Sequence, residues 1–174
     1  MSKGGLEVAD DVLMRRARGG DRAAFVGFAE RWWPAIARFA WCMLGNASQA
    51  ISVTEEVIGA VLESPQAPEE VPVGCFMYRL AIWLIIVRRR STRRADPPES
   101  AVLQALDRLA LIDRAAFLLR DIEQLSLART AAVLEASEDE VLRCVHRSRI
   151  FLTGMLGDAA NLDVGFDAKA RRMA

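Results

Sequence analysis

The sequence of 174 residues has little cysteine and histidine and no long apolar run. Its three cysteines, Cys42, Cys75 and Cys144, are odd in number and form no CxxC pair. This pattern excludes a disulfide framework and favours a reduced, cytoplasmic protein whose cysteines are buried packing residues. The only histidine is His146, so a zinc site would need ligands gathered from distant segments. We therefore expect no metal and no other cofactor.

Membrane segments and enzyme motifs are also missing. The longest apolar run is 80–87, whereas a membrane span needs about 20 residues. The first residues lack the apolar core of a signal peptide. No Gly-rich phosphate loop, HExxH, GxSxG or paired-carboxylate motif is present. The sequence therefore predicts a protein that does not insert into membranes and is not an enzyme.

The 23 basic and 23 acidic side chains cancel, which at first argues against a nucleic-acid-binding protein. The cancellation is an average, because residues 1–95 carry 13 basic and 10 acidic side chains and residues 96–174 carry 10 and 13. Five arginines lie within 88–94, and three more lie within 142–149 without an acidic residue. These two basic patches are candidate DNA contacts. The zero net charge of the chain predicts that it binds DNA weakly without a partner.

Apolar residues recur at helical spacing along the chain, and strand patterns are absent. In the first half, helices are expected over about 21–44, 48–62 and 73–90. Asp21 is a natural N-cap, Pro34 predicts a kink, and Gly45 ends the first of these helices. The helix over 73–90 is apolar on most faces, so we expect other helices to surround it and Trp83 to lie in the core.

A polar stretch with two prolines, 91–100, follows these helices and reads as a linker. After it, shorter helices are expected over about 100–109, 113–122, 126–134 and 137–154. We therefore predict an all-α protein of two small helical domains joined by a short linker, the second a helix-turn-helix domain. The predicted boundaries are 8–94 for the first domain, 95–99 for the linker, 100–155 for the second domain and 156–174 for a tail.

The strongest local signal lies at 126–152, where a short helix, a tight turn and a capped longer helix follow one another. The cap is a capping box between Ser137 and Glu140. In a helix-turn-helix the second helix lies in the major groove of DNA, although a plain helical hairpin with a solvated charged face explains the spacing equally well. The candidate DNA-binding residues are Ser137, Glu138, Leu142, Arg143, His146, Arg147 and Arg149.

A second signal is the arginine-rich end of the helix over 73–90, which also carries aromatic residues. Aromatic rings beside arginines are typical of sites that stack unpaired bases. Alternatively, the cations complement the C-terminal dipole of a helix that runs into a solvated linker. The candidate residues are Tyr78, Arg79, Trp83, Arg88, Arg89, Arg90, Arg93 and Arg94.

A third signal is an acidic face on the helix over 48–63, which could bind a basic partner. An ordinary solvated helix face is the simpler explanation of this pattern. The candidate partner-binding residues are Ser52, Val53, Glu55, Glu56 and Val57.

Taken together, these segments resemble the extracytoplasmic-function (ECF) sigma factors, the small two-domain promoter-recognition subunits of bacterial RNA polymerase. Residues 13–25 (LMRRARGGDRAAF) resemble the family's opening motif, and 54–58 (TEEVI) stand where the family has its polymerase clamp-binding helix. Residues 76–81 (FMYRLA) resemble the start of the helix that captures the melted promoter, and 145–149 (VHRSR) the end of the recognition helix. The resemblance spans about 8–153.

This resemblance implies a transcription initiation factor that binds core RNA polymerase and promoter DNA and is held by an anti-sigma factor. It implies base reading by Arg143 and Arg147, with His146 and Arg149 on phosphates. It also implies that the linker threads the RNA-exit region of the polymerase.

Six positions depart from the family's pattern, two of them, Gln49 and Ser52, where the clamp-binding helix usually has acidic residues. Trp83 and Val87 stand where the family usually has Asn and Asp, and Leu142 and Cys144 replace basic residues of the recognition helix. These departures motivate an alternative, a sigma-like interaction protein that binds polymerase or a regulator without reading a promoter. A repressor that uses only the helix-turn-helix is a further alternative, but it leaves the first domain without a role.

Overall fold

The structure, a computed structural model, describes residues 3–63, 71–91 and 100–157, except the side chains of 3–9, 90 and 91. The described residues form helices joined by turns, without a β-strand, which confirms the all-α fold. In chain order they are α1 (Lys3–Arg18), α2 (Arg22–Leu44), α3 (Ala47–Glu63), α4 (Val73–Ser91), α5 (Ala101–Arg108), α6 (Leu111–Phe117), η1 (Leu118–Ile122, a π-helical turn), α7 (Leu127–Leu134) and α8 (Glu138–Leu156).

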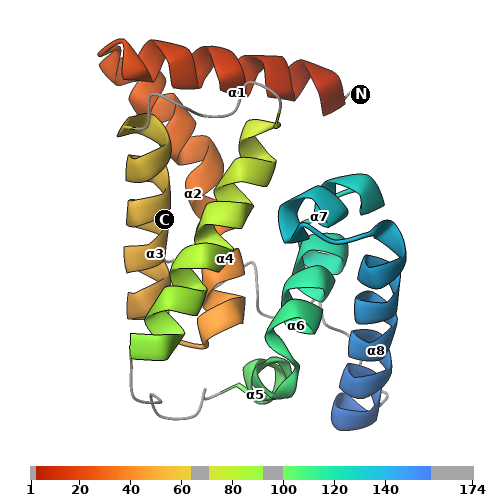
Figure 1. Ribbon diagram of the computed structural model, residues 1–174. Helices are drawn as coiled ribbons and strands as arrows, with labels where there is room; N and C mark the ends of the chain where they lie inside the picture. The colour runs from red at the N-terminus through yellow and green to blue at the C-terminus, as the bar shows by residue number, and fades with distance from the viewer. Residues whose placement is uncertain (1–2, 64–70, 92–99, 158–174) are drawn as a thin grey trace.

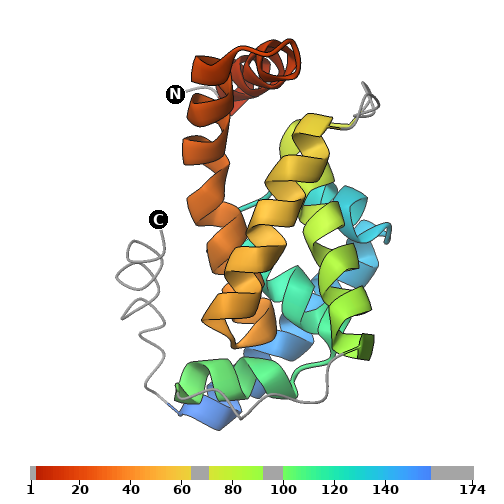
Figure 2. The same ribbon diagram turned by 90° about the vertical axis from the view of Figure 1, so that its left-hand side faces the viewer.

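The helices α2, α3 and α4 pack side by side, and α1 lies across one end of this group (Figures 1 and 2). The helices α5 to α8 gather on the flank formed by α2 and α4, where α4 contacts α7 and α2 contacts α5 (Figure 1). The predicted linker, 95–99, lies outside the described residues, and the division into two domains stays a prediction. Below, the first part means α1 to α4 and the second part means α5 to α8.

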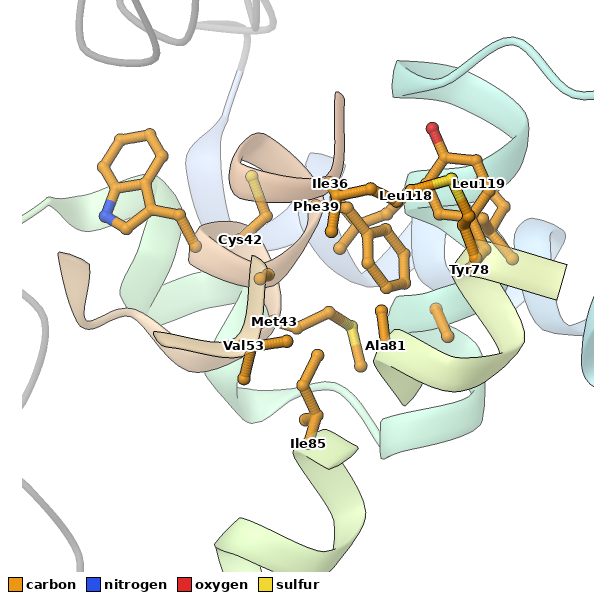
Figure 3. Packing of buried hydrophobic residues seen from close by; sticks show 14 of the residues in the cluster. Ile36, Phe39, Cys42, Met43, Val53, Tyr78, Ala81, Ile85, Leu118 and Leu119 are labelled. Atoms are coloured by element: carbon orange, nitrogen blue, oxygen red, sulfur yellow. The ribbon is translucent and has the colours of Figure 1, made fainter. Parts of the chain in front are cut away.

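One apolar cluster spans both parts. In the first part, α2 buries an apolar stripe that includes Ile36, Phe39 and Met43. Two buried leucines of the second part, Leu118 and Leu119, belong to the same cluster (Figure 3). Burying a side chain of this size stabilises the fold by about 1.5–3 kcal/mol, so both leucines contribute to the stability of this shared core.

The predicted helix caps at Asp21, Gly45 and Ser137 are present in the structure. The Asp21 carboxylate accepts a hydrogen bond from the Ala24 backbone N–H, and Gly45 ends α2 in the left-handed conformation at φ 68°. A residue without Cβ adopts that conformation without strain. Pro34 lies inside α2 and does not end it. Ser137 and Glu140 form the predicted capping box at the start of α8.

The helix α1 is not among the predicted helices. The glycines at 4 and 5 and the adjacent acidic residues Asp10 and Asp11 interrupt its apolar pattern. Tertiary contacts hold it instead. Asp10 accepts a hydrogen bond of 2.6 Å from Arg31 of α2, and Arg18 donates to the Val61 carbonyl of α3. Propensity is a weak guide where such contacts decide the local structure.

The expected core role of Trp83 is wrong, because its side chain is 58% exposed. The helices α2, α3 and α7 cover the other faces of α4, and Trp83 and Val87 occupy the face that they leave uncovered. The predicted burial of the three cysteines is confirmed.

Candidate nucleic-acid interface

The helices α7 and α8 form the predicted short helix, turn and long helix. Ser126 caps α7 by accepting a hydrogen bond from the Arg129 backbone N–H. Glu135 ends α7 in the left-handed conformation at φ 52°, and Ser137 begins α8 two residues later. Behind the turn, buried residues of α8 pack on Ala131 of α7 and Ala116 of α6. The local geometry is therefore that of a helix-turn-helix, with α8 as the second helix.

The outward face of α8 carries three of the predicted DNA-binding residues, one helical turn or less apart. Leu142 is 51% exposed, and Arg143 and His146 are exposed beside it. Neither Arg143 nor His146 has a hydrogen bond or an ion pair with any residue in the described ranges. Ser137 and Glu138 lie at the exposed start of the same helix, where Ser137 is engaged in the cap.

The other two arginines of α8 are bound to carboxylates of the neighbouring elements. Arg147 donates two hydrogen bonds to Asp113 of α6, at 2.6 and 3.1 Å. These hydrogen bonds lower the pKa of the Asp113 carboxyl below its ordinary value and raise the pKa of Arg147. Arg149 pairs in the same way with Asp121 of η1, at 2.5 and 2.9 Å. Both pairs fix α8 against α6 and η1.

The predicted promoter-melting residues of α4 have different surroundings. Trp83 is exposed, whereas Tyr78 is buried and donates a hydrogen bond of 2.9 Å to Glu123 in the second part. Arg79 and Arg89 form ion pairs with Glu135 and Asp107, also in the second part. Arg93 and Arg94 lie outside the described residues, as does the side chain of Arg90.

Arg88 connects two of the predicted surfaces. Its guanidinium donates hydrogen bonds to Ser52 Oγ at 3.0 Å and to the Glu56 carboxylate. Arg88 of the predicted DNA-binding set and two residues of the predicted polymerase-binding set are thus bonded to one another. Such contacts fix α4 against α3.

The predicted polymerase-binding residues of α3 divide into exposed and buried ones. Glu55 and Glu56 are exposed, and Ser52 is partly exposed. Val53 and Val57 are fully buried in the core, so in this fold they hold α3 in place and do not present a surface to a partner. The accessible part of the predicted surface is therefore its acidic edge.

Sequence reasoning missed the residues that join the two parts. Glu123 accepts hydrogen bonds from Arg38 and Tyr78, which are 85 and 45 positions away in the sequence. Arg114 of α6 is 1% exposed and donates to the Met43 carbonyl of α2. No local pattern signals such pairs, because their partners come from distant helices.

The described residues contain no group of three or more His, Cys, Asp or Glu side chains that could hold a metal ion. Burial raises the pKa of the Cys42 and Cys144 thiols, which disfavours the reactive thiolate form. Within residues 3–63, 71–91 and 100–157, no helix has both the length and the apolar character that a membrane crossing requires.

A match to a known family agrees with the helix-turn-helix geometry. The sequence model of the family "Sigma-70, region 4" matches residues 99–152. A solved structure of CnrH in complex with the cytosolic domain of CnrY is similar, with a TM-score of 0.70, 25% identity, and coverage of 87% of this chain and 99% of that chain. A structure of the RsbN–BldN complex aligns with a TM-score of 0.40 and 22% identity over 82% of this chain and 99% of that chain. No curated protein matches the chain significantly.

The second part of the chain thus matches sigma-70 region 4, a helix-turn-helix domain, over residues 99–152. The chain as a whole is similar in fold to CnrH over 87% of its length. Sigma-70 region 4 is not a family of enzymes.

Proposed function

We propose that this chain is a promoter-recognition subunit, which binds core RNA polymerase in the cytoplasm and directs transcription initiation. The observation that carries the proposal is the outward face of α8, where Arg143 and His146 are exposed and form no hydrogen bond or ion pair with another described residue, while Arg143 attracts the Glu140 carboxylate at longer range. They stand on the second helix of a region 4 domain, and that helix is the element that enters the major groove in helix-turn-helix proteins.

The three residues of this face have complementary chemistry toward base edges. Arg143 can donate two hydrogen bonds to O6 and N7 of a guanine, and Leu142 can contact the methyl group of a thymine. His146 lies one turn after Leu142 and can donate to a base or a phosphate. Arg147 and Arg149 position α8 through Asp113 and Asp121, and their exposed edges can contact phosphates.

The helix α4 is the second proposed contact with DNA. Trp83 presents an exposed indole ring, and Val87 is exposed one turn further on. An exposed indole beside arginines can stack on an unpaired base irrespective of its hydrogen-bonding pattern. We propose that Trp83 contacts the melted promoter strand by stacking. This stacking does not require the Asn and Asp that the family usually has in place of Trp83 and Val87.

The helix α3 is the proposed contact with the polymerase clamp, through Glu55 and Glu56 at its exposed acidic edge. A protein inhibitor is the further partner that we propose, because the similar protein CnrH was solved in complex with the cytosolic domain of CnrY.

An alternative function is a sigma-like interaction protein that binds polymerase or a regulator and reads no promoter. The observation that favours it is the acidic first turn of α8, formed by Glu138, Asp139 and Glu140. These carboxylates complement the helix dipole but would repel the phosphates of DNA that approached this end of the helix.

Run-off transcription with core RNA polymerase and a promoter library separates the two functions. The proposed function predicts that the chain binds core polymerase and yields promoter-dependent transcripts, and that Arg143→Ala reduces them. Arg22→Ala, which removes the same charge at an exposed site on α2, serves as the matched control and leaves them unchanged. Core binding without any promoter-dependent transcript would overturn the proposal in favour of the alternative.

A further inference from the structure

Ile150 of α8 is an exposed apolar residue that neither the predicted DNA-binding set nor the proposed function uses. It is 62% exposed, the largest value among the large hydrophobic residues that the structure describes. The helices α5, α6 and α7 pack on the opposite side of α8 (Figure 1). Because an apolar side chain gains stability only when it is removed from water, Ile150 contributes little to the fold and is available to a partner.

Ile150 lies on the outward face of α8, in line with the proposed DNA contacts. Successive residues of an α-helix are rotated by about 100° around its axis, so Ile150, seven residues after Arg143, is only about 20° away from it. His146 lies between them on the same face. Met155 is rotated away from this face, and its Sδ contacts Arg108 of α5. Ile150 is therefore continuous with the surface that carries Arg143 and His146.

The spacing of this face matches that of a helix that lies along the major groove. In such helices, base-contacting residues recur at positions i, i+3, i+4 and i+7. In α8 these four positions are held by Arg143, His146, Arg147 and Ile150. The helix has 19 residues, which correspond to about 28 Å at 1.5 Å per residue. It is therefore long enough to follow the groove beyond its first two turns.

The charges of α8 favour contact with DNA through the middle and the second half of the helix. The first turn is formed by Glu138, Asp139 and Glu140, whose carboxylates would repel phosphates at that end. Residues 141–157 contain no acidic side chain, and they carry three arginines and the only histidine of the chain. The phosphates on either side of the groove therefore favour a position of α8 in which 143–150 lies deepest.

The chemistry of an isoleucine side chain selects one feature of the groove. An aliphatic side chain can neither donate nor accept a hydrogen bond, so it cannot read the polar edges of the bases. The C5 methyl group of thymine is the apolar group that the major groove presents. Contact between this methyl group and Ile150 removes apolar surface of both from water. Thymine is therefore the base that Ile150 fits.

We infer that Ile150 is a further specificity-determining residue, which contacts the methyl group of a thymine in the upstream promoter element. This inference rests on the proposed function, in which α8 enters the major groove. Ile150 and Arg143 are about 10 Å apart along the helix axis, and successive base pairs are about 3.4 Å apart. The thymine therefore lies about three base pairs from the base pair that Arg143 reads, and the second half of α8 sets part of the sequence preference.

Uracil in place of thymine tests this contact, because uracil pairs in the same way but lacks the methyl group. The element is first selected from a random library of duplexes, both by the free chain at about 50 mM salt and by polymerase that carries the chain. Each thymine of the selected element is then replaced in turn. One replacement, about three base pairs from the position that Arg143→Ala relaxes, should weaken binding about fourfold, the effect of one buried methyl group.

Variants at Ile150 assign this effect to the side chain. In Ile150→Ala the thymine and uracil duplexes should bind equally, whereas Ile150→Val should retain the preference for thymine. Alanine has a higher helix propensity than isoleucine, so Ile150→Ala keeps α8 intact. Ile112→Ala is the matched control, because it removes the same side chain at a 45% exposed position of α6. It should leave the preference for thymine unchanged.

The outcomes separate this inference from the proposed function. An element with a position that depends on Arg143, but without a thymine whose methyl effect depends on Ile150, would overturn the inference and leave the proposed function intact. Weaker core-polymerase binding in Ile150→Ala, with the methyl effect retained, would assign Ile150 to a protein contact and also overturn the inference. The absence of any enriched element would overturn the proposed function and this inference with it.

Discussion

Arg143 and Arg147 lie one turn apart on α8, and only Arg147 is hydrogen-bonded to a carboxylate among the described residues. Asp113 holds Arg147 by two hydrogen bonds, whereas Arg143 has no ion pair among the described residues. An arginine without a partner can bind a guanine without first breaking an ion pair. We therefore expect Arg143 to be the main base-reading arginine, and Arg147 to act chiefly by holding α8 against α6.

This difference predicts a position-specific effect of Arg143→Ala. The substitution should cost about 1–3 kcal/mol of binding at one base position and relax specificity there. Promoter variants changed at single positions, bound to polymerase that carries the chain, measure this effect. The control Arg22→Ala should leave the profile unchanged, and a uniform loss over all sequences would assign Arg143 to a phosphate.

The pair of Asp113 and Arg147 also predicts a pH dependence of stability. Hydrogen bonds from Arg147 lower the pKa of Asp113 in the folded chain. The unfolded chain therefore binds the proton more readily, so the stabilisation is present above about pH 4 and is lost as the pH falls through the lower folded value. Asp113→Asn should lower the free energy of unfolding by about 1 kcal/mol at pH 7. The difference should shrink at about pH 2, and urea denaturation at both pH values measures it. An unchanged difference would contradict this account.

At the level of single residues, the sequence predicts those whose partner is local. Asp21 and Ser137 cap helices through backbone groups three residues away, so their roles follow from the order of residues alone. The roles of Glu123 and Arg114 depend on helices brought together by folding. Trp83 is wrongly predicted because an apolar residue on an apolar helix does not reveal which face stays uncovered.

The start of α8 is the helix end on which the proposed interface depends. Ser137 accepts a hydrogen bond from the Glu140 backbone N–H, and the Glu140 carboxylate accepts one from the Ser137 backbone N–H. Ser137→Ala should therefore destabilise the helix by about 1 kcal/mol, whereas Ser137→Asn should retain the cap. Hydrogen exchange in the first turn of α8 should accelerate in the alanine variant alone. Equal exchange in both variants would exclude the cap as the cause of order there.

Whole helices could be predicted where an apolar stripe is long. The expected 48–62 and 73–90 differ from α3 and α4 by one residue at most at either end. The expected single helix 113–122 begins earlier, at Leu111, and changes to a π-helical turn at Leu118. A change in winding within a continuous helix leaves the apolar spacing nearly intact, so the periodicity does not reveal it.

The arrangement of the two parts is a property of the whole molecule that the sequence did not predict. A linker at 91–100 indicates where two groups of helices separate, but not how they pack. Their packing depends on the shared core and on charge pairs such as Arg38 with Glu123. The sequence therefore predicts the two basic patches of the candidate site. It does not predict that arginines of these patches form ion pairs with carboxylates of the second part.

The neutrality of the whole chain predicts weak, weakly salt-dependent DNA binding in the absence of polymerase. Pairs such as Arg149 with Asp121 engage cations of the described residues within the chain. With about two to four phosphates neutralised, the slope of log affinity against log salt should be about −2 to −4. Fluorescence anisotropy from about 50 to 200 mM salt measures this slope. A slope near −8 would contradict the expectation that the zero net charge of the chain limits its DNA binding.

The central claim is that the chain selects promoters for RNA polymerase. The most direct test is to sequence the transcripts that core polymerase makes from a random-sequence DNA library, with and without the chain. The claim predicts that the chain enriches start sites that share an upstream duplex element and a melted element at a fixed spacing, and that Arg143→Ala alters only the upstream element. Start sites that are identical with and without the chain would contradict it.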